Sequence, residues 1–242
     1  MEFVYVVKRA ELFDLSTPHG FVARERPPTA GAGGQGAAGG TGSAPGIPPG
    51  DRVARWTAAI RSRGFFLERR HAELDAGFKQ VIPYTLVVHG DEVLLLTRLG
   101  KGGEARLHGK LSIGVGGHIN PVDLDGPGHA PATLAPGAAP ARADVLDAGC
   151  RRELEEEIEI RCPYTLSAVG IINDDSSDVG SVHFGLVNVA RCETKDVAIR
   201  ETDMLEGSFV NVAALREIAR GQPGRFETWS ALIVDRLDDV LR

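Results

Sequence analysis

Three glutamates close together in the sequence are the residues best suited to chemistry. Glu153, Glu156 and Glu157 stand at i, i+3 and i+4 of the helix-forming segment 150–160, so their carboxylates share one face of the predicted helix. Carboxylates packed side by side repel each other unless a hard cation lies between them, and such oxygen-rich clusters suit Mg²⁺ or Mn²⁺. A solvated acidic face is the other interpretation of this helix taken alone.

A glycine turn precedes the acidic helix, and the two together form a motif. Gly116-Gly117-His118-Ile119-Asn120, then Asp144, then residues 152–160 resemble the Nudix box. The pattern of that family is Gly, five residues, Glu, seven residues, and then Arg-Glu-aliphatic-x-Glu-Glu-x-Gly-aliphatic. Counting back seven residues from Arg152 places Asp144 at the first acid of the pattern.

The sequence departs from the Nudix pattern in three places. A low-complexity insertion, 123–142, splits the box, and Asp144 is one methylene shorter than the usual Glu. Glu159 replaces the glycine that closes the helix in the left-handed conformation, at a cost of about 1 kcal/mol. None of the three changes the spacing of the glutamates themselves.

The resemblance implies a metal-dependent hydrolase acting on a nucleoside diphosphate linked to another group. Glu153, Glu156, Glu157 and the carbonyl of Gly117 would hold Mg²⁺ or Mn²⁺, which lowers the pKa of bound water. Arg152 would orient a carboxylate through a forked hydrogen bond, the other interpretation being a surface ion pair. The implied partners are a small-molecule phosphoanhydride and a second copy of the chain in a possible homodimer.

Further site residues are expected outside the box. Family members often take another carboxylate from a later loop; Glu201 is the first candidate and Glu206 the second, and an exposed loop acid is the alternative for either. His118 and His183 could bind a metal or relay protons, or simply be structural. Basic residues that could meet substrate phosphates, or form a solvated loop, are Arg98, Lys101, Arg106 and Lys110.

The elements that must position these residues are strands on both sides of the box. Their alternation and turn residues predict a mixed sheet with the acidic helix on one face and a C-terminal helix on the other, an α/β (α+β) fold of the Nudix-type α/β/α sandwich class. The expected strands are 81–88, 92–97, 164–172, 181–189, 197–200 and 208–212, and the expected C-terminal helices are 213–220 and 227–241.

The chain divides into two parts by composition. Residues 1–77 are expected to be an N-terminal extension with a Gly/Ala/Pro linker at 27–50, a strand at 2–8 and a helix at 51–62. Residues 78–242 are expected to be the Nudix domain, interrupted by the insertion 123–142.

Bulk properties narrow the class of protein. A net charge of −6 argues against broad binding to nucleic acid or to an anionic membrane. The sequence has no apolar run of about 20 residues and no basic N-terminal region followed by an apolar core, so we expect a cytoplasmic protein. Three widely spaced cysteines favour small buried apolar roles over a disulfide framework.

Two other functions are compatible with the same fold. A nucleotide sensor would bind without cutting, but it has no need of a complete carboxylate set. An isoprenoid-diphosphate isomerase would use a Cys and Glu pair across the pocket, whereas Cys150 lies before the metal helix, where packing is expected. The identity of the substrate is not encoded in any motif of the sequence.

Overall fold

A ten-stranded sheet forms the centre of the molecule. The computed structural model describes residues 1–13, 17–25, 51–99, 109–124, 144–200 and 202–241. Strands β4 and β10 are parallel, and the other pairs are antiparallel, so the sheet is mixed. The principal strands, in spatial order, are β12 (Leu205–Asn211), β5 (Glu92–Arg98), β4 (Phe78–His89), β10 (His183–Cys192), β9 (Tyr164–Asn173) and β2 (Gly20–Ala23).

The N-terminal residues belong to this same sheet. β1 (Phe3–Lys8) pairs with β4 and with β3 (Phe65–Glu68), and β2 pairs with β9. The predicted strand at 2–8 and the predicted helix at 51–62 are confirmed, the latter as α2 (Arg52–Arg63), which Asp51 caps. Two short helices complete this part: α1 (Arg9–Leu12) and α3 (Arg69–Ala72).

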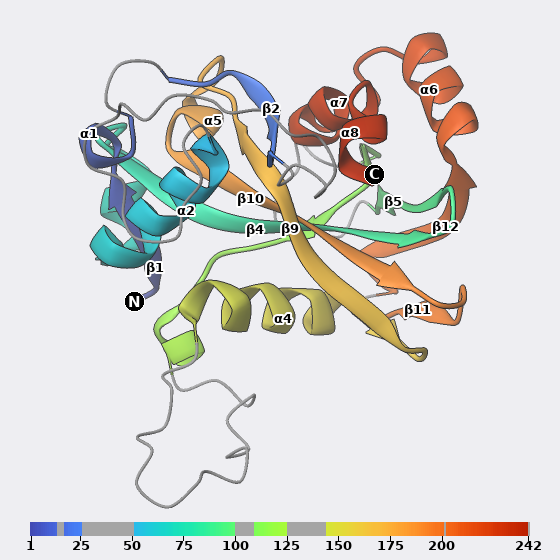
Figure 1. Ribbon diagram of the computed structural model, residues 1–242, viewed down its shortest axis with the longest axis horizontal. Helices are drawn as coiled ribbons and strands as arrows, with labels where there is room; N and C mark the ends of the chain where they lie inside the picture. Colours follow the sequence, from blue (N-terminus) through green and yellow to red (C-terminus); the bar gives the residue numbers. More distant parts are fainter. Residues whose placement is uncertain (14–16, 26–50, 100–108, 125–143, 201, 242) are drawn as a thin grey trace, which may run out of the picture.

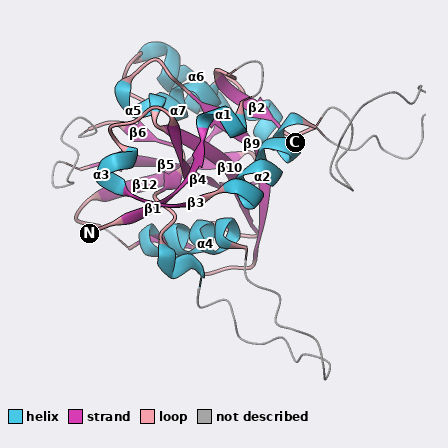
Figure 2. Cartoon of the chain, turned by 90° about the vertical axis from the view of Figure 1, so that its left-hand side faces the viewer, coloured by secondary structure: helices cyan, strands magenta, loops and turns pink. Residues whose placement is uncertain are grey.

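Helices cover both faces of the sheet (Figures 1 and 2). The acidic helix α4 (Val145–Glu157) packs Leu154 on one face, in a cluster that contains Val87. On the other face, Leu86 and Val88 pack in a cluster with the C-terminal helices. Neighbouring residues of β4 thus point to opposite layers. The predicted α/β/α sandwich with a mixed sheet is confirmed, and its second layer consists of α6 (Val212–Gly221), α7 (Thr228–Val234) and α8 (Leu237–Leu241).

Two predicted helices have different ends in the structure. The acidic helix stops at Glu157, and Ile158–Ile160 form strand β8, which pairs with β11 (Val197–Ile199). The two β-branched isoleucines favour a strand, and Ile158 is buried there. The predicted helix 227–241 is divided into α7 and α8.

Short elements connect the sheet to the acidic helix. β6 (Leu111–Ser112) and β7 (Val115–Gly116) pair with β5 and β4, and the 3₁₀ helix η2 (Pro121–Leu124) follows. A further short helix, α5 (Asp178–Ser181), lies between β9 and β10. Within the described residues, no helix has both the length and the apolar character needed to cross a membrane.

Candidate active site

The acidic helix is fixed to the sheet along one side. Leu146, Cys150 and Leu154 are buried, and the Cys150 thiol lies 3.2 Å from the Thr85 hydroxyl of β4. The predicted packing role of Cys150 is therefore confirmed. These anchors set the rotation of the helix and leave Glu153, one residue before Leu154, at the border between core and solvent.

Gly117 lies directly against one of the predicted metal-binding carboxylates. A Cβ atom built on Gly117 would overlap the carboxylate of Glu153, so any side chain at this position would displace it. The glycine is required here by close approach rather than by an unusual backbone angle. The predicted glycine turn and the predicted ligand Glu153 are therefore adjacent in space.

Arg152 is the hub of the site. Its Nε donates to Asp123 at 2.7 Å, its Nη2 to the other oxygen of Asp123 at 2.9 Å, and its Nη1 to Glu153 at 2.8 Å. Nη1 also lies 3.2 Å from both oxygens of Glu156, and Nη2 donates to the His118 carbonyl at 2.7 Å. The guanidinium thus joins η2, the glycine turn and two carboxylates of α4, far more than a surface ion pair.

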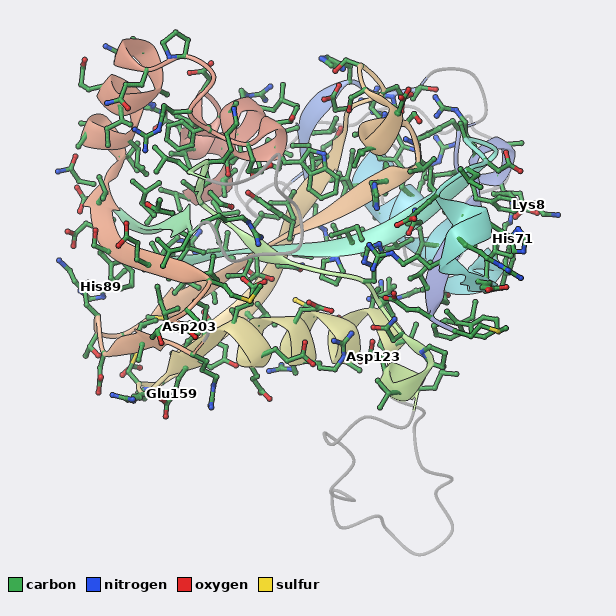
Figure 3. The ribbon with its side chains drawn as sticks, turned by 180° about the vertical axis from the view of Figure 1, so that it is seen from behind. Lys8, His71, His89, Asp123, Glu159 and Asp203 are labelled. Atoms are coloured by element: carbon green, nitrogen blue, oxygen red, sulfur yellow. The ribbon has the colours of Figure 1, made fainter. Side chains whose placement is uncertain are left out.

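The first acid of the box is Asp123, which corrects the assignment to Asp144. Asp144 is the N-cap of α4, accepts from the Leu146 backbone and pairs with Arg61 at 2.5 Å. Asp123 is almost fully buried and binds Arg152. Figure 3 shows Asp123 near one end of α4. Five residues separate Gly117 from Asp123, as the family pattern requires, and this signal is already in the sequence. The insertion therefore follows the acid instead of preceding it.

The four carboxylates of the site differ in burial and in their charged neighbours. They are those of Asp123, Glu153, Glu156 and Glu157. The side chain of Asp123 is 2% exposed, that of Glu153 13% and that of Glu156 54%. Burial raises the pKa of Glu153, although Arg152 opposes that rise. The hydrogen bonds to Asp123 raise the pKa of Arg152, so the guanidinium stays charged. Glu157 is half-buried, and its backbone carbonyl accepts from Arg200 at 2.8 Å.

The donor set fits a hard divalent cation in its chemistry. Glu153 and Glu156 present carboxylate oxygens, and Gly117 lets the backbone of the turn approach the Glu153 carboxylate, which a Cβ would overlap. Across the described residues, no three His, Cys, Asp or Glu side chains converge on one point. The Arg152 guanidinium binds the carboxylates of Glu153 and Glu156. A cation at this site would therefore share carboxylate oxygens with Arg152.

The remaining predicted residues lie in different places. Arg98 ends β5, and Lys110 Nζ donates to the Gly224 carbonyl near the C-terminal helices. Glu206 is exposed on β12, opposite Thr97 of β5. Glu201, Lys101 and Arg106 lie outside the described residues, as do 125–143 of the insertion and 27–50 of the linker.

The two histidines named above lie together beside the glycine turn. The rings of His118 and His183 have centroids 5.5 Å apart, and their Nε2 atoms are 3.4 Å apart. Burial lowers the pKa of His118 to about 3, with smaller contributions from Arg69 and His183. Sequence reasoning listed both residues but gave no reason to place them in contact.

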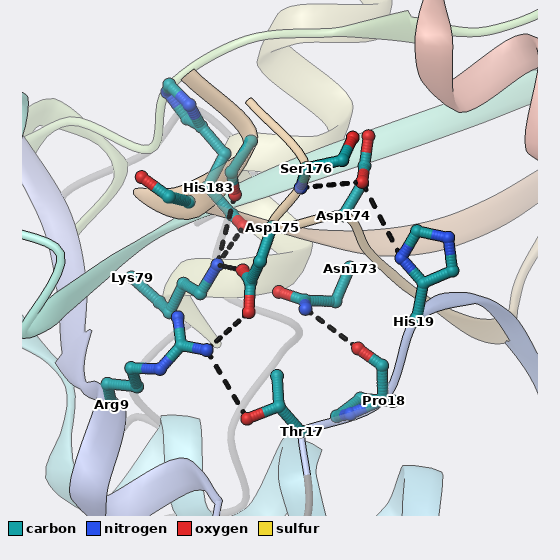
Figure 4. A network of polar contacts seen from close by, with 12 residues as sticks. Arg9, Thr17, Pro18, His19, Lys79, Asn173, Asp174, Asp175, Ser176 and His183 are labelled. Carbon is teal, nitrogen blue, oxygen red and sulfur yellow. Dashed lines mark hydrogen bonds and ion pairs between the residues drawn. The ribbon is translucent and has the colours of Figure 1, made fainter. Parts of the chain in front are cut away.

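A second buried network, missed in the sequence, braces the loop before His183. Lys79 is fully buried and donates to Asp175 at 2.6 Å and to the carbonyls of Gly180 and His183 at 3.0 and 3.1 Å. Arg9 of α1 donates to the other oxygen of Asp175 (Figure 4). The N-terminal segment is thereby tied to the start of β10.

Comparison with known proteins assigns the fold and the family. No family model matches the sequence. A crystal structure of Tm1382, described as a candidate Nudix hydrolase, superposes with a TM-score of 0.66 at 24% identity and covers 99% of both chains. The chain therefore has a fold of the Nudix type, as the sequence predicted.

A closer relative by sequence defines the family itself. Protein YmaB of Bacillus subtilis is 37% identical over 190 residues, which is 77% of this chain and 84% of YmaB. The chain belongs to the same protein family as YmaB.

Proposed function

We propose that the protein is a Mg²⁺- or Mn²⁺-dependent hydrolase that cleaves a phosphoanhydride bond in a nucleoside diphosphate linked to another moiety. The observation that carries the proposal is the contact between Gly117 and Glu153 within the hydrogen-bond reach of Arg152. This arrangement unites the two halves of the box, although an insertion separates them in sequence. The proposed ligands are Glu153, Glu156, Glu157 and the Gly117 carbonyl.

The residues of the chain have distinct roles in this proposal. A cation bound by the glutamates would offset charge on the phosphates and lower the pKa of a bound water. Arg152 holds Glu153 and Glu156 in place, and Asp123 holds Arg152 through two hydrogen bonds. Because Asp123 is buried, it fixes the position of the Arg152 guanidinium. The guanidinium in turn pre-organises the carboxylates that would face the substrate.

Two other functions have less support. An isomerase would need a reactive cysteine across the pocket, whereas Cys150 is buried and burial raises the pKa of its thiol. A sensor that binds without cutting would not need the complete set of three glutamates, and all three are present on α4. The general base and the substrate-binding roles of Glu201, Arg98, Arg106 and Lys110 stay predictions.

The proposal is tested with a panel of substrates. The full chain is incubated with sugar nucleotides, dinucleoside polyphosphates, dinucleotide cofactors and nucleoside triphosphates, with Mg²⁺ and with a chelator, and released phosphate or nucleotide is measured. We expect release from at least one diphosphate-linked nucleoside that stops when the metal is removed. Binding of a nucleotide that stabilises the protein equally with and without Mg²⁺, and no release from any substrate, would favour the sensor.

A further inference from the structure

Two histidine rings meet in a T-shaped arrangement, and their Nε2 atoms lie at a separation that suits a shared metal ion. His118 Nε2 and His183 Nε2 are 3.4 Å apart. Two imidazole nitrogens bound to one tetrahedral Zn²⁺ at 2.0–2.1 Å lie roughly 3.3–3.4 Å apart. A hydrogen bond between the same atoms would be long, since N–H donors usually lie 2.7–3.2 Å from their acceptors. The spacing therefore fits metal ligation better than a direct contact.

The orientation of His183 leaves its Nε2 atom available. His183 Nδ1 lies 2.7 Å from the Val179 carbonyl, which can only accept, so Nδ1 carries the proton and Nε2 of the neutral ring carries the lone pair. A ring nitrogen bound to a backbone carbonyl is the usual outer support of a metal-binding histidine. Lys79 holds the backbone of the same residue through the His183 carbonyl (Figure 4).

A buried amide beside His183 lacks partners. Gln80 is fully buried, and neither Nε2 nor Oε1 of its side chain has a hydrogen-bond partner among the described residues. Gln80 and His183 are directly paired in the parallel strands β4 and β10, so their side chains project from the same face of the sheet. A buried amide without partners is energetically costly, and such groups usually bind an ordered water or an ion.

Cationic groups around the histidine pair disfavour positive charge on the rings, but neighbouring carboxylates offset them. The positively charged groups that act on the two rings are each already paired with carboxylates. These pairs are Arg69 with Glu2 and Glu73, Arg152 with Asp123 and Glu153, and Lys79 with Asp175.

We propose that His118 and His183 bind a borderline divalent cation such as Zn²⁺, with the Gln80 amide facing its open coordination positions. Imidazole nitrogen selects Zn²⁺ and its transition-metal neighbours over Mg²⁺, so this site differs in chemistry from the glutamate site and does not rest on the hydrolase proposal. No third His, Cys, Asp or Glu joins the pair within the described residues, so water or the amide oxygen completes the coordination. Occupancy would link the loop after β7 to the start of β10.

The test is binding of Co²⁺ and Zn²⁺ to the full chain in excess Mg²⁺. Visible absorption of Co²⁺ reports nitrogen ligation, and calorimetry gives the Zn²⁺ affinity and stoichiometry. We expect one ion per chain. His183→Asn keeps a donor for the Val179 carbonyl but removes Nε2, and we expect it to weaken binding at least about tenfold, as His118→Gln should.

Controls separate this site from the surface and from the proposed active site. His71→Ala removes an exposed histidine and should leave the Co²⁺ spectrum unchanged. Glu156→Gln should also leave it unchanged, even where hydrolysis is lost. The proposal is overturned if the native chain binds neither ion, or if His183→Asn and His118→Gln bind both ions as tightly as the native chain.

Discussion

Two polar clusters lie on opposite faces of the same sheet, and they are built differently. On the α4 face, Arg152 joins Asp123, Glu153 and Glu156. On the other face, the Tyr84 hydroxyl bonds to Glu227 at 2.5 Å and to Ser230 at 2.7 Å. Glu227 also accepts from the first backbone amides of α7, Trp229 at 2.9 Å and Ser230 at 2.7 Å.

The difference between the clusters lies in their excess charge. The Tyr84 cluster holds one carboxylate, Glu227, which several donors surround, so the cluster is complete and joins α7 to β4. The Arg152 cluster sets one guanidinium against three carboxylates, which leaves an excess of two negative charges. A stable fold does not require such an excess, and this excess supports the cation site proposed above.

The largest expected effect is the loss of hydrolysis when one of the carboxylates of the Arg152 cluster is neutralised. Glu156→Gln should lower hydrolysis at least about 100-fold, because it removes a proposed metal ligand, a loss at least as large as that of an outer support. It should leave the free energy of unfolding within about 0.5 kcal/mol, since the side chain is 54% exposed. Steady-state hydrolysis and urea unfolding measure the two effects.

The matched control for that change is Glu155→Gln, an exposed residue on the same helix. Its activity should equal that of the native protein. Equal activity in Glu156→Gln and Glu155→Gln would show that the charge excess has no catalytic use, and the contrast between the two clusters would fail.

The buried acid of the site should matter more than the acid that caps the helix. Asp123→Asn leaves Arg152 without its buried counter-charge and should cost about 3 kcal/mol of unfolding free energy, with a 10- to 100-fold loss of activity. Asp144→Asn keeps a good N-cap residue and should cost less than about 1 kcal/mol, with activity unchanged. Urea unfolding and steady-state kinetics of the two variants decide whether Asp123 or Asp144 is the first acid of the box. A larger loss in Asp144→Asn than in Asp123→Asn would favour Asp144.

Sequence alone predicted the local part of this site but not the long-range part. The i, i+3 and i+4 spacing of the glutamates and the neighbouring Arg152 depends on one helix, so local pattern was sufficient. The first acid was misassigned because the insertion makes the count from Gly117 and the count from Arg152 disagree. Spacing does not tell which side of an insertion keeps the original contact.

Contacts between distant segments were beyond reach for a physical reason. Tyr84 and Glu227 are 143 residues apart, and Lys79 and Asp175 are 96 apart. Such pairs depend on the register of strands and on the packing of helices, which no local periodicity encodes. The mixed sheet and its two helical layers were predictable because alternation and helical spacing are local signals.

The Tyr84 cluster should affect stability alone. Tyr84→Phe removes the hydroxyl that contacts Glu227 and Ser230, and should lower the free energy of unfolding by about 1–2 kcal/mol. Glu227 keeps its two backbone donors, so α7 should still form. Thermal and urea unfolding give the stability, and kcat/KM should stay at the native value. A large loss of activity without a loss of stability would show that this face also belongs to the site.

A third cluster, in which Asp175 binds Arg9 and Lys79, is charged like the first and complete like the second, and its contribution should depend on pH. Burial alone would raise the pKa of Asp175, but hydrogen bonds from Arg9 and Lys79 outweigh it and lower that pKa to about 2. A lowered carboxyl pKa stabilises the fold above the unfolded value of about 3.9, and this stabilisation is lost as the pH falls towards 2. Since the side chain is 29% exposed, we expect about 1–2 kcal/mol.

The pH dependence of unfolding isolates this contribution. Between about pH 5 and pH 2, the urea midpoint of the native protein should fall more steeply than that of Asp175→Asn, because only the native side chain takes up a proton on unfolding in that range. Asp174 lies beside the network and pairs with His19 at 3.6 Å, so Asp174→Asn serves as the matched acid. Parallel curves for the native protein and Asp175→Asn would mean that the pKa of Asp175 is the same in the folded and the unfolded protein. Charge in a complete cluster would then be without energetic effect, and the excess at Arg152, rather than charge itself, would be what distinguishes the site.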